Sequence, residues 1–206
     1  MKIKLALGRR RFWAGLLASL AVGMAARGAE PTALQLAKEG DRYVGDQAKG
    51  RIVQIRSERS AGSLVPVIWY VVYYDPTATL KAAEVKFVAG KMEDVKRPLR
   101  LLEPVTGGDV PLDRDKIKVD SDQAIQTALK EPVLQNIKVT STELKLERGE
   151  GEGVLGKGGA AQPVWKVRLW ATKLNQVGSQ ADLGEVWVSA TDGKVLKDDL
   201  HVDRLQ

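Results

Sequence analysis

Residues 163–170 read Pro-Val-Trp-Lys-Val-Arg-Leu-Trp, a stretch in which apolar and charged side chains alternate. Successive side chains of a β-strand point to opposite faces of a sheet, so this stretch predicts a strand with one buried and one solvated face. A second proline-led stretch at 66–74 reads Pro-Val-Ile-Trp-Tyr-Val-Val-Tyr-Tyr and is apolar on both sides. Strands of that kind are usually covered on both faces. We therefore expect residues 67–74 to lie at a junction between two parts of the chain.

The surroundings of these two stretches repeat each other at low identity. Residues 33–37 lie 91 positions before residues 124–128, and both segments have the apolar spacing of a helix. The same offset relates the alternating segments 53–57 and 144–148. Each copy therefore begins with a helix and continues into strands.

Local signals mark where these elements begin and turn. Thr32 with Gln35 forms a capping box before the first helix, and Asp120 precedes the second. The last strands turn back at a glycine followed by a lysine, and Asp192-Gly193 is a strong hairpin signal.

These signals predict an α+β fold of two tandem units, each with one helix packed on a three- to four-stranded antiparallel sheet. The boundaries follow from the composition: an export signal at 1–28, unit 1 at 30–100, a linker at 101–112 and unit 2 at 113–206. The linker is rich in proline and glycine.

The first 28 residues have the three-part layout of a secretory signal peptide. Residues 1–11 are basic, residues 12–26 are apolar, and small residues follow up to a cleavage point near Gly28. The apolar run is shorter than the roughly 20 residues that span a bilayer. We therefore expect a periplasmic or secreted protein with no permanent membrane anchor after cleavage. Residues 9–13 also resemble the twin-arginine export motif, and an ordinary basic segment is the alternative.

Charge and cysteine content exclude several classes of protein. The formal net charge of +6 comes from six basic residues within 1–28, so the mature chain is balanced. Nucleic-acid binding needs a clustered basic surface, which this balance argues against. The chain contains no cysteine, and this excludes disulfide scaffolds, thiol catalysis and cysteine-bound zinc.

Three stretches of unit 2, the helix 124–129, the strand 164–167 and the strand-turn-strand 186–195, together resemble the PepSY domain. This domain occurs in the propeptides of secreted peptidases and in many exported bacterial proteins. In that family an acidic residue usually stands at the place of Ser189 and a threonine at that of Asp192. The resemblance covers residues 113–200, and it reaches residues 31–97 only through the internal repeat. A tandem of such units is also similar in fold to the β-lactamase-inhibitor-protein architecture.

The resemblance implies a non-catalytic domain that binds or restrains another protein, often a peptidase. It brings no universal active-site residues, and we expect neither catalysis nor a cofactor. The binding surface we expect is the open face of the unit 2 sheet, because strand alternation sends aromatic and cationic side chains there. The alternative is that unit 1 or the loop at 173–183 covers the tryptophans. The expected partner-binding residues are Trp170, Trp187, Lys166, Arg168 and Lys145.

Two other patterns suggest chemistry. Asp199, His201 and Asp203 alternate and would share one face of a strand, which gives the alternative of a small-ligand- or metal-binding cell-envelope protein. Their position in the last eight residues, where chains fray, argues against a metal. Residues 151–156 spell G-x-G-x-x-G, but a strand follows them instead of the helix that phosphate binding needs. A hairpin insertion is the better interpretation.

Overall fold

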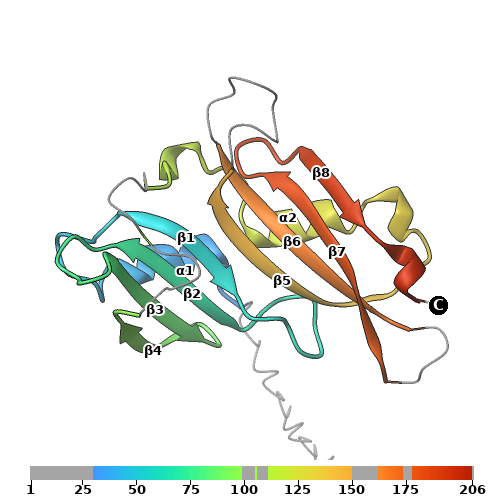
Figure 1. Cartoon of the computed structure of the whole chain (residues 1–206), viewed down its shortest axis with the longest axis horizontal. Helices are drawn as coiled ribbons and strands as arrows, with labels where there is room; N and C mark the ends of the chain where they lie inside the picture. The colour runs from blue at the N-terminus through green and yellow to red at the C-terminus, as the bar shows by residue number, and fades with distance from the viewer. Residues whose placement is uncertain (1–29, 99–104, 106–110, 150–161, 174–177, 206) are drawn as a thin grey trace, which may run out of the picture.

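The computed structural model describes residues 30–98, 105, 111–149, 162–173 and 178–205. These residues form two similar series, each of one α-helix followed by four strands (Figure 1). The bounds are α1 Ala33–Gly40, β1 Ile52–Ser57, β2 Ile68–Tyr74, β3 Ala82–Val88, β4 Lys91–Lys96, α2 Ser121–Ala128, β5 Val139–Arg148, β6 Pro163–Thr172, β7 Gln180–Ser189 and β8 Val195–Leu200. The same residues also form three short 3-10 helical turns, which are η1 Arg114–Lys116, η2 Pro132–Leu134 and η3 Val202–Leu205.

The eight strands form one antiparallel sheet in the order β4-β3-β2-β1-β5-β6-β7-β8. The expectation of two units, each with its own sheet, is therefore wrong. β1 pairs directly with β5, at Ile55 with Leu146 and at Arg56 with Lys145, and this pairing makes the sheet continuous (Figure 1). The physical reason is that both strands would otherwise leave unpaired backbone edges, which pairing across the repeat satisfies.

The pairing relates the two halves of the chain by an approximate twofold axis. Ile55 and Leu146 are 91 positions apart, so the two residues that face each other occupy equivalent places in the repeat. Two identical subunits meet in this way at a twofold dimer interface. Here the interface lies within one chain.

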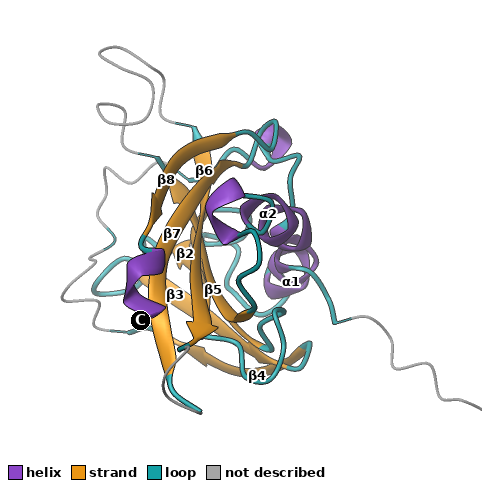
Figure 2. Ribbon diagram, turned by 90° about the vertical axis from the view of Figure 1, so that its right-hand side faces the viewer, coloured by secondary structure: helices purple, strands orange, loops and turns teal. Residues whose placement is uncertain are grey.

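Both helices lie on the same face of the sheet, as Figure 2 shows. α1 packs against β1 and β2, and α2 packs against β6 and β7. The core between helices and sheet is one cluster that includes residues of both halves. Its largest members include Trp165, whose indole N–H donates to the carbonyl oxygen of Val119 at 2.8 Å, and Tyr73, whose hydroxyl donates to the carbonyl oxygen of Ala37 at 3.2 Å.

The two helices meet at their N-termini, where residues of α2 cap α1. The hydroxyl of Ser121 accepts a hydrogen bond from the Ala33 N–H at 3.1 Å. The Asp120 carboxylate accepts from its own neighbour Ser121 at 2.6 Å and from the Leu34 N–H at 3.1 Å. The first amides of a helix have no partner within the helix. One carboxylate therefore serves amides of two helices.

The expected helix starts and strand faces are confirmed. Gln35 accepts a hydrogen bond from the Thr32 N–H, and Gln123 accepts one from the Asp120 N–H, which is one half of each capping box. The Thr32 hydroxyl is buried and has no hydrogen-bond partner among the described residues, so the other half of that box is not made. In β6 the side chains of Trp165, Val167 and Leu169 belong to the core. Their neighbours Lys166 and Arg168 are at least partly exposed.

The position expected for the apolar strand 67–74 is wrong. Its structured part, β2, lies between β1 and β3, and β1 makes the junction. The outer face of β2 is apolar because Val72 packs with Ala82 and Val105 in a small second cluster. The export signal at 1–28, most of the linker and the glycine-rich loop lie outside the described residues.

Candidate interaction surface

The sheet face opposite the helices carries one row of cations and aromatic rings across seven strands. The row runs through directly paired positions of β3, β2, β1, β5, β6, β7 and β8. Its spacing is the strand separation of about 4.8 Å, so the row is about 29 Å long. We call it the cation–aromatic row. Its members are Lys86, Tyr70, Arg56, Lys145, Lys166, Trp187 and Lys197.

The aromatic rings of the row are stacked with the cations beside them. The ammonium nitrogens of Lys166 and Lys197 lie 4.4 and 5.0 Å from the ring centroid of Trp187. The Arg56 guanidinium lies 3.9 Å from the ring centroid of Tyr70. Cation–π contacts of this kind contribute about 0.5–1 kcal/mol each at exposed sites. They hold both rings in fixed orientations.

Carboxylates beside the row pair with its cations. Glu147 bridges Lys145 at 2.9 Å and Lys166 at 2.6 Å, and it also accepts a hydrogen bond from Gln54 of β1. Burial raises the pKa of Glu147, but the hydrogen bonds from the two lysines outweigh burial and lower its pKa. Arg56 pairs with Glu84 at 2.9 Å. Ion pairs therefore lie along the row on both sides of the junction, and the hydrogen bond from Gln54 to Glu147 crosses it.

The structure places four of the five expected binding residues in reach of solvent and one in a covered position. Lys145, Lys166 and Trp187 are members of the row and half-buried. Arg168 is exposed on the same face of β6 and pairs with Asp182. Trp170 is only 8% exposed, because the guanidinium of Arg59 from the first half lies 4.5 Å from its ring centroid. The alternative that unit 1 covers a tryptophan therefore holds for Trp170.

Arg59 fixes this cover through further contacts. Its Nε donates to the hydroxyl of Ser141 at 3.0 Å, and it also donates to Gln180. Both partners belong to the second half. Trp170 thus helps to join the halves, and Trp187 is the tryptophan of the row that a partner can reach.

A shallow pocket of about 270 Å³ lies beside the row at the end of β8. Glu185 stands at its edge and accepts a hydrogen bond from the Trp187 indole N–H at 2.7 Å. Among its lining residues His201 lies 3.3 Å from Asp199, whereas Arg168 pairs with Asp182, which is not one of them. Its lining residues are Arg168, Gly184, Glu185, Asp199, His201 and Arg204.

The alternating cluster at the C-terminal end is only partly brought together. His201 Nε2 lies 3.3 Å from a carboxylate oxygen of Asp199, whose other oxygen lies 3.2 Å from Lys197. β8 ends at Leu200, and Asp203 belongs to the turn η3, so the strand alternation does not extend to it. Across the described ranges, no set of three His, Cys, Asp or Glu residues is arranged to hold a metal ion.

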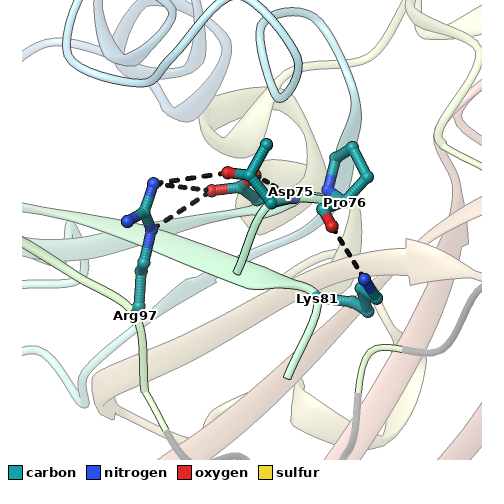
Figure 3. Close-up of polar contacts among 5 residues, drawn as sticks. Asp75, Pro76, Lys81 and Arg97 are labelled. Atoms are coloured by element: carbon teal, nitrogen blue, oxygen red, sulfur yellow. Dashed lines mark hydrogen bonds and ion pairs between the residues drawn. The ribbon is translucent and has the colours of Figure 1, made fainter. Parts of the chain in front are cut away.

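A buried carboxylate, Asp75, directly follows the last residue of β2. Asp75 is 4% exposed and accepts hydrogen bonds from Thr77, and it pairs with Arg97 at 3.3 Å (Figure 3). Burial raises the pKa of Asp75, but the bonds from Thr77 and the Arg97 charge outweigh it and lower the pKa. Lys81 donates to the carbonyl oxygen of Pro76 at 2.7 Å. These contacts fix the connection between β2 and β3.

Sequence reasoning missed Lys197 of β8 and the part of the row that lies in the first copy. Lys86 and Arg56 alternate with apolar residues in their strands, and this was the available signal, whereas the strand of Tyr70 is apolar on both sides. The signal identifies the outward side of the two alternating strands. It does not reveal that β1 and β5 are neighbours, and only that pairing joins the two sets into one row.

Within the part of the chain that the structure describes, no helix has the length and apolar character needed to cross a membrane. No family model, no curated protein and no solved structure matches this chain. The PepSY resemblance stays a prediction from the residues quoted above.

Proposed function

We propose that this chain is an exported, non-catalytic PepSY-like protein that binds another extracytoplasmic protein through the open face of its sheet. The amino-terminal sequence supports export, and the residues 124–129, 164–167 and 186–195 support the PepSY resemblance. A peptidase is the partner class that this resemblance implies. Restraint of that peptidase would then follow from occupation of its surface.

The observation that carries the proposal is the cation–aromatic row. Tryptophan, tyrosine and arginine are the residues most enriched among those that dominate binding energy at protein interfaces. The row holds one of each, and the neighbouring cations are lysines. Both helices pack on the other face, so the row stands on the face that they leave uncovered (Figure 2).

Trp187 is the proposed anchor because it is already fixed in place. Its ring lies between the ammonium groups of Lys166 and Lys197, and its N–H is bonded to Glu185. A side chain that is ordered before binding loses little rotational freedom on binding, and this saves about 0.5–1.5 kcal/mol. Lys145, Lys166 and Arg168 supply the charges that orient the partner.

The test measures capture of a partner by the mature chain and by a double variant. The mature chain serves as bait in a cell-envelope extract, and the captured protein is then titrated against Trp187→Ala combined with Lys166→Ala. Loss of a hot-spot residue costs at least about 2 kcal/mol, so we expect affinity to fall by roughly 30-fold. Circular dichroism verifies that the variant is folded.

The matched control changes an aromatic residue and a lysine on the opposite side. Tyr43, which is 38% exposed, and Lys38 belong to the helix side of the sheet. Tyr43→Ala with Lys38→Ala should leave affinity unchanged. Equal affinity for the wild type and the folded row variant would refute this surface.

A further inference from the structure

The chemistry of the partner segment follows from how charge is arranged along the row. Arg56, Lys145 and Lys166 of the row are more exposed than the carboxylates that pair with them, whereas Lys86 is less exposed than its partner Glu93. The Arg56 side chain is 35% exposed against 10% for Glu84, and Lys145 is 28% exposed against 20% for Glu147. Glu147 also serves Lys166, so two ammonium groups share one carboxylate. A ligand that lies along the row meets cations first.

The internal ion pairs of the lysines leave donors for a ligand. An ammonium group carries three N–H donors, and the ion pair of Lys166 with Glu147 is one direct contact of that ammonium. A carboxylate of a partner can therefore join such a pair without breaking it.

The width of the row limits the shape of the ligand. Residues two positions away along each strand lie about 6.6 Å to either side of the row. On one side Glu84 flanks Lys86 and Glu147 flanks Lys145, and on the other Glu143 and Glu185 flank Lys145 and Trp187, with Arg168 between them. A broad polyanion would overlap these carboxylates and be repelled. A single extended chain fits between them.

On this charge complementarity, and resting on the proposed function, we propose that the part of the partner seated on the row is an extended acidic peptide segment. It crosses the strands of the sheet, and its carboxylates meet Arg56, Lys145 and Lys166. Tyr70 and Trp187 stand at the two ends of these three cations and contact the flanking residues of the peptide.

The test uses a fluorescein-labelled peptide of alternating glutamate and glycine, with alternating glutamine and glycine as the neutral probe. Fluorescence anisotropy is measured with the full mature chain at ionic strengths of about 0.01 M and about 0.15 M, where the screening length falls from about 30 to about 8 Å. We expect saturable binding of the glutamate peptide that weakens at least tenfold with salt. The glutamine peptide should not bind.

Charge-reversal variants locate the site. Lys145→Glu with Lys166→Glu should abolish binding, whereas Lys38→Glu with Lys49→Glu changes the net charge equally away from the row and should have little effect. Should the reversed variant fail to fold, Lys145→Gln with Lys166→Gln is expected to lower affinity about tenfold. The inference is overturned by absence of saturable binding below about 1 mM, by equal effects of the row and control variants, or by tighter binding of a single-stranded oligonucleotide.

The two proposals can fail separately. If the acidic peptide does not bind while the Trp187 and Lys166 variant still loses its captured partner, the row is the binding site and the partner segment is not acidic. If the captured partner is unaffected by that variant, the surface itself is wrong.

Discussion

Replacing Asp120 with alanine removes a hydrogen-bond acceptor from two helices at once. The carboxylate of Asp120 accepts from the Ser121 N–H at the start of α2 and from the Leu34 N–H near the start of α1. Gln123 bonds to the Asp120 backbone and is unaffected by the substitution. The change therefore isolates the carboxylate.

The expected cost is the sum of two terms. Loss of the N-cap side chain of α2 costs about 1 kcal/mol. The partly buried Leu34 N–H loses its partner, which costs about 1–2 kcal/mol more. A total near 2–3 kcal/mol corresponds to a fall in Tm of roughly 4–12 °C for a chain of this size.

Urea unfolding followed by tryptophan fluorescence and far-ultraviolet circular dichroism measures the effect. Asp122→Ala is the matched control, because Asp122 is an exposed carboxylate in the same first turn of α2. Its loss should cost about 0.5 kcal/mol through the helix dipole. Asp120→Asn keeps an acceptor oxygen and should lose less than half of what alanine loses. If Asp120→Ala is no less stable than Asp122→Ala, the shared cap does not stabilise the fold.

Two further predictions concern the second half of the chain. Gly184 has φ +101°, and a Cβ there would collide with the carbonyl oxygen of Asp199 on β8, so Gly184→Ala should cost about 2–4 kcal/mol in urea unfolding. Gly178→Ala, at φ +81° with open space around it, should cost only about 1 kcal/mol, and equal losses would contradict the collision. Burial and the nearby Asp198 raise the pKa of Glu131, so its contribution to stability is present below the unfolded pKa near 4.5 and is lost as pH rises through the folded pKa. Glu131→Gln should accordingly raise the free energy of unfolding at pH 7 but not at pH 4, and no gain at pH 7 would refute this reasoning.

The faces of the second-half strands could be predicted from the sequence because strand alternation is a local property. Trp165 and Val167 alternate with Lys166 and Arg168, and only one arrangement buries the apolar pair. The helix starts were predictable for the same reason, since a capping box lies within four residues.

The joining of the halves could not be predicted, because it depends on contacts distant in sequence. β1 and β5 carry no local signal for each other, and their pairing extends over only two registered residue pairs. The apolar outer face of β2 suggested a junction, but Val105 covers Val72 there instead. Strand alternation likewise predicts that a partner can reach Trp170, but Arg59, which lies 111 positions earlier in the sequence, covers its ring.

The shared cap also sets an order on how the chain can assemble during synthesis. α1 is eight residues long, and isolated helices of that length are marginal in water. The hydroxyl that accepts the hydrogen bond from the Ala33 N–H belongs to Ser121, 88 positions later. A nascent chain that ends before Ser121 therefore leaves that amide without this acceptor. The first helix of the described residues can thus complete its N-terminal hydrogen bonds only after the start of the second has been made.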